Sequence, residues 1–170
     1  MTRSYNDIVR AMGGVIVAAA LVLTTVFAAT AQDRGGTPSL EIISACKLLM
    51  SAIDGLFADI EVMFAPGGKV DLAYGGKQAD IISIMLTAFP HLFPSSTNQW
   101  KPNADRDPAT DTYASPELWN KFADFNQRVT EASKIAFDLS KAERAEDFKA
   151  LAARLRAGCD SCHAAYMKTE

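Results

Sequence analysis

The sequence predicts an all-α protein built as an antiparallel four-helix bundle. Apolar residues recur at steps of three and four in four separate segments, and no segment after residue 31 shows the alternation of apolar and polar residues typical of strands. Most connections between these segments are short, which favours antiparallel neighbours. A chain of 170 residues with 22% charged and 49% hydrophobic residues is typical of one ordinary globular domain, so two large domains are excluded.

The first 31 residues have the features of a secretory signal peptide. Arg3 and Arg10 precede an uncharged run over residues 11–31, which ends in Ala29-Thr30-Ala31. A basic start, an apolar middle and small residues at the end are the pattern that signal peptidase cleaves. We therefore expect cleavage after Ala31. The alternative is an uncleaved membrane anchor, because an uncharged run of this length is long enough to span a bilayer.

The remainder of the chain divides into a polar linker at residues 32–37 and a bundle domain at residues 38–170. Two of the 17 basic residues and one of the 20 acidic residues lie in the first 31, so the remainder has a formal net charge of −4. Nucleic acid is therefore not expected as a partner. Three cysteines are an odd count for an exported protein, which argues against a disulfide framework.

The first two helices are expected at residues 38–64 and 77–89. Thr37 and Pro38 provide a capping residue and a first-turn proline for the first of them. The second follows a Gly-Gly pair and is closed by prolines. Residues 94–114 are rich in Pro, Ser, Thr, Asn and Asp, so they are expected to form a long surface loop.

The third and fourth helices show the strongest periodicity. Ser115 and Pro116 repeat the cap-then-proline signal, which predicts one continuous helix from there to Ser140. The same spacing continues over residues 143–168, interrupted only by Gly158. Such helices would look the same in a purely structural bundle, so the periodicity alone predicts no function.

The chemistry lies in the string Cys159-Asp160-Ser161-Cys162-His163, near the end of the fourth predicted helix. This is the C-x-x-C-H pattern by which haem c is attached: each thiol forms a thioether with a vinyl group, and the adjacent imidazole reaches the iron. Attachment of this kind takes place outside the bacterial inner membrane, which agrees with a periplasmic location. We expect one covalently attached haem c.

Three other interpretations of these residues stay open. A thioredoxin-like redox site would need a preceding strand in a βαβ context. A zinc ion would take Cys159, Cys162 and His163 as ligands, with Cys46 as the fourth. A plain disulfide between Cys159 and Cys162 would leave no role for the histidine. The haem interpretation is preferred because the sequence shows neither a strand before the motif nor a second local cysteine pair.

The chain resembles the class II c-type cytochromes, the cytochrome c prime family. The resemblance covers nearly all of residues 38–168. It rests on C-x-x-C-H-x-x-Tyr at 159–166, on Leu-Phe-Pro at 92–94 and on Pro-Glu-Leu-Trp at 116–119. It implies a four-helix bundle with the haem in its core, held by Cys159 and Cys162, with His163 as the proximal iron ligand.

On the other face of the iron, the resemblance implies either an open site against a bulky side chain or a methionine of the first helix. Met50 falls at that distal position. A thioether is a soft ligand suited to haem iron, and Met/His ligation raises the reduction potential. The alternative is that Met50 only fills the core. Met63 and Met85 lie on other turns, and His91 is expected at the surface.

Two positions depart from the family pattern. Cys46 stands where a basic residue is common, and we expect it to be buried and inert; an exposed Cys46 would allow an intermolecular disulfide. Met167 stands where a basic residue usually follows the tyrosine, with Lys168 as its substitute. These departures affect the expected surroundings of the haem propionates.

The resulting hypothesis is a periplasmic electron carrier with one haem and no enzymatic activity, because the sequence shows no nucleophile–base constellation. The alternative is a five-coordinate, high-spin member of the same family that binds NO or CO. The expected partners are redox proteins. The resemblance also implies the option of a homodimer through the first two helices.

Overall fold

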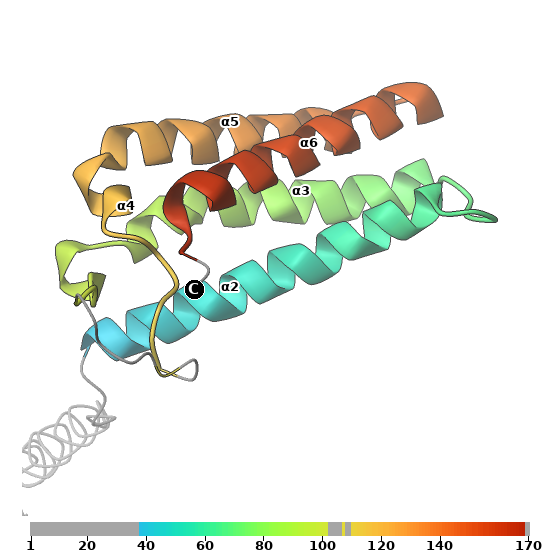
Figure 1. Cartoon of the computed structure of the whole chain (residues 1–170). Coiled ribbons are helices and arrows are strands. Elements are labelled where there is room, and N and C mark those ends of the chain that lie inside the picture. The colour runs from blue at the N-terminus through green and yellow to red at the C-terminus, as the bar shows by residue number, and fades with distance from the viewer. Residues whose placement is uncertain (1–37, 102–106, 108–109, 169–170) are drawn as a thin grey trace, which may run out of the picture. The chain divides into compact units, whose positions relative to one another are not determined.

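The computed structural model describes residues 38–101, 107 and 110–168 (Figure 1). The signal peptide expected at residues 1–31 and the linker at 32–37 lie outside the described residues. No helix in the described ranges is long and apolar enough to cross a membrane.

Within this part of the chain the fold is all-α, as predicted. No strand is present among the described residues, where the one isolated bridge joins Ala114 and Met167. The long helices are α2 (Pro38–Glu61), α3 (Leu72–Ala88), α5 (Phe122–Ser140) and α6 (Ala145–Tyr166), and the short elements are α4 (Glu117–Asn120) and the 3-10 turns Val62–Phe64, Phe89–Leu92 and Ser95–Thr97.

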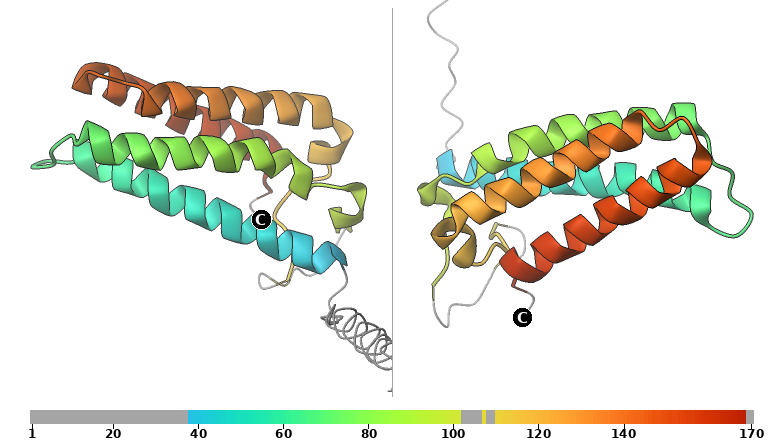
Figure 2. Two further views of the ribbon diagram at one scale, coloured as in Figure 1. Left: turned by 180° about the vertical axis from the view of Figure 1, so that it is seen from behind. Right: turned by 90° about the horizontal axis from the view of Figure 1, so that it is seen from above.

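Successive long helices run antiparallel, and the three views agree on their arrangement (Figures 1 and 2). α3 packs against α2 on one side and against α5 on the other, and α5 packs against α6. α2 makes only sparse backbone contact with α6. The bundle is therefore well packed through α3 and α5, while α2 and α6 stay apart.

α3 begins five residues earlier than the sequence predicted, at Leu72 instead of residue 77. The N-cap residue is Asp71, whose side chain accepts a hydrogen bond from the backbone N–H of Tyr74 at 2.9 Å. A short acidic side chain at this position satisfies one of the free N–H groups of the first turn. The start of α3 is therefore set by the cap at Asp71, which the sequence analysis missed.

Gly75 and Gly76 lie inside α3 because neighbouring elements come too close for a side chain. A Cβ added at Gly75 would lie 2.5 Å from Cζ of Phe148, and one at Gly76 would lie 3.1 Å from the carbonyl oxygen of Ser140. These glycines therefore serve helix packing, and treating them as a helix start was wrong.

The third predicted helix is broken in two at Lys121, where the backbone leaves helical geometry with φ −118° and ψ 38°. Ser115 does not cap α4 with its side chain; its N–H instead donates to the carbonyl oxygen of Tyr166 at 2.8 Å. The entry to α4 is thus tied to the end of α6. The expected helices at 38–64 and 143–168 agree with the structure to within a few residues.

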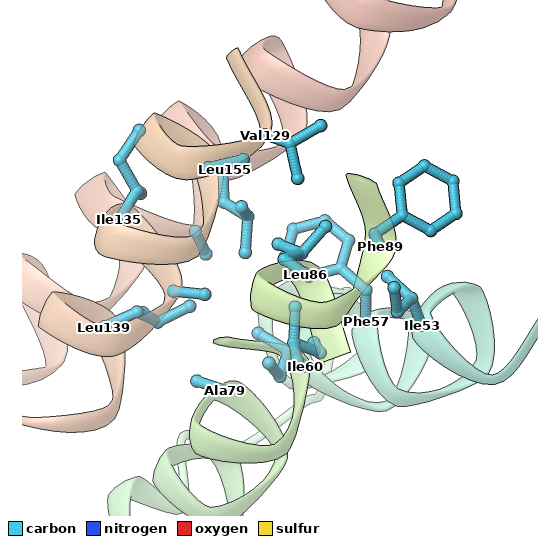
Figure 3. Close-up of a cluster of buried hydrophobic side chains, with 14 of the residues drawn as sticks. Ile53, Phe57, Ile60, Ala79, Leu86, Phe89, Val129, Ile135, Leu139 and Leu155 are labelled. Carbon is cyan, nitrogen blue, oxygen red and sulfur yellow. The ribbon is translucent and has the colours of Figure 1, made fainter. Parts of the chain in front are cut away.

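The hydrophobic core lies between the four long helices, each of which contributes buried side chains (Figure 3). The amphipathic spacing seen in the sequence brings these side chains to the inner faces. The residues labelled in Figure 3 are Ile53, Phe57, Ile60, Ala79, Leu86, Phe89, Val129, Ile135, Leu139 and Leu155.

Candidate functional site

A cavity of about 440 Å³ lies where α2 and α6 stay apart. Its volume falls in the range of roughly 300–1,000 Å³ that is typical of sites for small molecules and cofactors. The four residues that the sequence analysis expected to hold the haem line it: Met50 from α2, and Cys159, Cys162 and His163 from α6. The fold therefore brings together residues from the two ends of the bundle domain.

One wall of the cavity is apolar and aromatic, and it includes Phe125, a fully buried residue of α5. The Phe125 ring meets those of Phe93 and Tyr166 edge to face, with centroids 5.1 Å and 5.6 Å away. Phe89 adds a tilted ring at 6.2 Å. Interlocked aromatic rings form a rigid wall. A large planar apolar cofactor fits this lining.

The two motif cysteines are free thiols, half-buried at the cavity wall. Burial raises the pKa of both thiols above its ordinary value. A nearby guanidinium opposes this rise in each case: Arg156 lowers the pKa of Cys159, and Arg128 lowers that of Cys162. Each thiol thus faces both an apolar cavity and a positive charge.

The rival interpretations of the motif find no support in the part of the chain that is described. The motif lies within helix α6, and no strand precedes it there. No group of three or more His, Cys, Asp and Glu side chains in the described ranges could hold a metal ion, so Cys46 does not complete a zinc site with the motif. The two motif cysteines form no disulfide.

His163 and Met50 line the cavity from two different helices, α6 and α2. His163 is on the last turns of α6 with an exposed side chain, and its backbone oxygen accepts a hydrogen bond from the N–H of Met167 at 2.8 Å. Met50 is half-buried on α2. Met63 and Met85 do not line this cavity. Met50 is the methionine of α2, and it lines the cavity together with Met167, which follows α6.

Cys46 lies one turn before Met50 and lines the same cavity. Only 9% of it is exposed, as expected from the sequence. Burial raises the pKa of its thiol from 9.0 to about 11. This thiol therefore stays protonated at neutral pH, and its burial argues against an intermolecular disulfide. His91 is exposed in the turn after α3, also as expected.

The segment just before α4 forms part of the cavity wall. Thr112, Tyr113 and Ala114 line it, and Ala114 forms the isolated bridge with Met167 at the end of α6. The N–H of Lys168 donates to the carbonyl oxygen of Tyr113 at 3.0 Å. The Lys168 ammonium lies over the Trp100 ring, 3.9 Å from its centroid. Lys168 does not line the cavity, and its substitution for the basic residue of the family pattern stays a prediction.

An ion pair bridges α2 and α6. Arg156 donates to both carboxylate oxygens of Glu61, at 2.8 Å and 2.7 Å. Its guanidinium also lies over the ring of Phe57, 4.5 Å from the centroid. A bidentate pair with an aromatic stack is the geometry for which arginine is best suited.

Arg128 and Arg156 are two cavity residues that sequence reasoning missed. Arg156 precedes the first motif cysteine by three residues, which puts both on one helix face. That signal was available but not specific. Arg128 had only the i, i+4 spacing to Asp124, a pattern common on exposed helix faces. Its place beside the motif depends on how α5 packs against α6.

A helical bundle with an apolar cavity beside a helix-borne C-x-x-C-H motif defines a bundle-type c-type cytochrome. The comparison with protein families identifies which one. A family model described as Cytochrome C' matches residues 41–167, so the chain belongs to the cytochrome c′ family.

Solved structures of the family share this fold. Cytochrome c prime from Shewanella frigidimarina has 20% identity and a TM-score of 0.67, with 79% of this chain and 99% of that chain covered. Cytochrome c′ from Rubrivivax gelatinosus has 16% identity and a TM-score of 0.63, with 76% and 97% covered. R. palustris cytochrome c556 has 21% identity and a TM-score of 0.62, with 76% and 97% covered. No curated protein sequence matches the chain.

As a member of this family the protein is a monohaem c-type cytochrome with one covalently attached haem c. The apolar cavity with two cysteines and a histidine in its wall fits that group. Proteins of the family are periplasmic and act as electron carriers or ligand binders. The predicted family, fold and cofactor are thereby confirmed.

Proposed function

We propose that this cytochrome is a periplasmic electron carrier with a six-coordinate iron. Cys159 and Cys162 hold the haem through thioethers, His163 is the proximal ligand and Met50 the distal one. The observation that supports this assignment is that Met50 and His163 line one cavity from facing helices. The haem supplies one-electron redox chemistry, and the protein supplies its ligands and surroundings.

The residues around the cavity suit electron transfer more than catalysis. A thioether ligand opposite an imidazole raises the reduction potential. The buried rings of Phe89 and Phe125 exclude water from one side of the site, and a low-dielectric shell also tunes the potential. No group in this role has to gain or lose a proton, so the protein is proposed not to be an enzyme.

The second candidate function is binding of NO or CO at a five-coordinate, high-spin iron. The family to which the chain belongs favours it, since the matched model is described as Cytochrome C'. A solved cytochrome c′ with 17% identity is described as having ligand-controlled dimer dissociation. In this case Met50 would be part of the cavity wall without binding the iron.

Spectra of the oxidised protein separate the two functions. With Met50 bound, we expect a low-spin iron, a weak band near the red end of the spectrum and slow CO binding, because the thioether must leave first. M50A should remove the band and speed CO binding. M85A is the matched control, because Met85 is half-buried on α3 and does not line the cavity. A high-spin unmutated protein that binds CO rapidly would instead support the gas-binding function.

Covalent attachment and export are tested on the same preparation. The haem should resist acid–acetone extraction and add the mass of one haem to a chain that begins at Gln32. C159A and C162A should weaken attachment, and H163A should abolish the native spectrum. Extractable haem would contradict the attachment residues. An intact N-terminus in the membrane fraction would favour the anchor over the cleaved signal peptide.

We also propose a homodimer through α2 and α3, in addition to redox protein partners. Large apolar side chains are exposed on both helices: Leu48 is 72% exposed and Ile84 65% exposed. Burying such side chains in an interface is favourable. Analytical ultracentrifugation should find a dimer that L48E or I84E converts to a monomer. A monomeric unmutated protein would contradict this assembly.

A further inference from the structure

Two charged side chains of α5 contact the turns of α6 that carry the C-x-x-C-H motif. Nη1 of Arg128 donates to Oγ of Ser161 at 2.8 Å, and Ser161 lies between the two motif cysteines. Nε of Arg128 donates to Oδ2 of Asp124 at 2.7 Å. The Tyr166 hydroxyl donates to the same Asp124 oxygen. One carboxylate–guanidinium pair thus contacts α6 on both sides of His163.

The motif segment of α6 has no fully buried side chain of its own. Leu155 and Tyr166 are buried, but every residue from 156 to 165 is exposed or half-buried. Gly158 contributes no side chain, and a Cβ there would have no neighbouring atom within 4 Å. Between Leu155 and Tyr166, the apolar contacts of this segment with the core come from the half-buried side chains of Cys159 and Cys162. Polar contacts with α5 therefore add to the orientation of this part of the helix.

Asp124 and Arg128 both lie on α5, and an ion pair that joins α5 directly to α6 provides a contrast. Nη2 of Arg154 lies 4.0 Å from Oε1 of Glu131, and both side chains are more than half exposed. Exposed pairs of this kind contribute little. The Asp124–Arg128 pair is shorter, has hydroxyl partners on α6 at both ends, and includes a residue that lines the cavity.

We propose that Asp124 and Arg128 are positioning residues, which fix the rotation of α6 so that the motif cysteines and histidine face the cavity. This role rests on the proposed function, because it takes those three residues as the attachment points and the proximal ligand. Successive residues of a helix are about 100° apart around its axis, so a modest rotation moves both sulfur atoms away from the two vinyl groups they must reach. Contacts to Ser161 and Tyr166 oppose that rotation.

A guanidinium is suited to this role because its donors point in fixed, different directions. Nε reaches Asp124 while Nη1 reaches Ser161. A lysine would keep the positive charge, but its ammonium is a single compact group on a flexible stem. It cannot hold both acceptors in one geometry. R128K therefore separates the positioning role from a purely electrostatic one.

The test compares variants of the two ion pairs in the haem-loaded protein. R128K, D124N and S161A alter the contacts with the motif segment, whereas R154K and E131Q alter the control pair. Ser161 is exposed, so S161A leaves the packing of the bundle intact. Intact-mass analysis of the expressed protein measures the fraction of chains with attached haem. Electron paramagnetic resonance of the loaded fraction reports the arrangement of the iron ligands.

We expect R128K and D124N to lower the fraction with attached haem on the order of 10-fold, the size of effect that outer partners have at other metal sites. Their resonance spectra should contain more than one iron species. S161A should show the same spectral change with a smaller loss of haem, and the control variants should match the unmutated protein.

Unchanged attachment and spectra in R128K would overturn the positioning role. Equal changes in R154K would overturn it as well, because a general loss of α5–α6 contact would then explain them. An unmutated protein without covalent haem would overturn both this role and the proposed function. Loaded, spectrally normal variants would overturn the positioning role alone.

Discussion

The two sides of the bundle are held together in different ways. α3 and α5 approach closely: Gly76 leaves room for the backbone at Ser140, and Ala79 and Ala136 are fully buried. α2 and α6 are instead bridged around the cavity, where Arg156 binds Glu61. Close packing fixes the first pair of helices. The second pair keeps space between its backbones for the haem.

The polar contacts also differ between the two sides: they are made by short side chains on the packed side and by long side chains on the open side. Between α3 and α5, the hydroxyl of Ser133 donates to the carbonyl oxygen of Ser83 at 2.9 Å. The same hydroxyl lies 3.0 Å from the hydroxyl of Thr87. These short side chains fit between closely packed helices. The contact across the cavity uses long charged side chains that reach over a wider gap. On the packed side, the distance between the helices is therefore set by how well their surfaces fit together. On the open side, it is set by how far the charged side chains reach.

The largest effect is expected from a cavity made in the packed side. Leu139 on α5 is 0% exposed and does not line the haem cavity. L139A should lower the free energy of unfolding by about 2–5 kcal/mol, because the neighbouring side chains cannot collapse fully into the space. Denaturant unfolding of the haem-loaded protein measures this loss. V62A, at a 64% exposed position, is the control. A similar loss of unfolding free energy in both variants would contradict the conclusion that close packing holds this side of the bundle together.

A smaller effect is expected from adding one methyl group. G75A should destabilise by about 1–3 kcal/mol, because its Cβ would lie 2.5 Å from Cζ of Phe148, a buried ring. G55A should stabilise by about 0.5–1 kcal/mol, because a Cβ at this position in α2 meets no atom within 4 Å. The midpoints of thermal unfolding compare the two variants. If G75A and G55A both stabilised the protein, α3 would have room for a side chain at Gly75, and the packing there would not be close.

Breaking the ion pair across the cavity should have a smaller effect again. The Glu61–Arg156 pair is partly exposed, so E61Q and R156Q should show a coupling energy of roughly 0.2–1 kcal/mol in a double-mutant cycle. The coupling should fall as salt is added, because ions screen partly exposed charges. A salt-independent coupling would indicate that stacking of Arg156 on Phe57 dominates.

The last prediction concerns the reactivity of the Cys46 thiol and not the stability of the fold. Burial raises the pKa of the Cys46 thiol from 9.0 to about 11, so at pH 8 the thiolate should be about 100-fold scarcer than for a free cysteine. Alkylation by iodoacetamide should be slower by at least that factor and should accelerate as the pH approaches 11. Rapid alkylation at pH 8 would show that the cavity admits solvent as far as α2.

The sequence was a good guide to features that depend on neighbouring residues. Apolar spacing of three and four residues determines an amphipathic helix, and each of the four long helices overlaps a segment in which this spacing predicted one. The C-x-x-C-H motif is also local, and its five consecutive residues are enough to indicate the haem. The burial of Cys46 followed from its position on the apolar face of the first helix.

Features that depend on contacts between helices were missed. Gly75 lies inside α3 because Phe148 of another helix occupies the space that a side chain would need. The break at Lys121 was hidden by periodicity that continues across it, and the end of α6 is tied to the chain just before this break.

By itself, the sequence determined that four amphipathic helices form and that the last of them carries the two thiols and the imidazole, because both follow from residues within a few positions of each other. Only the tertiary structure decided that Met50 faces the same cavity as His163, and that Arg128 reaches Ser161. These pairs are far apart in the chain. Their proximity follows from α2 and α6 standing apart while α5 packs against α6, which depends on how whole helix surfaces fit together.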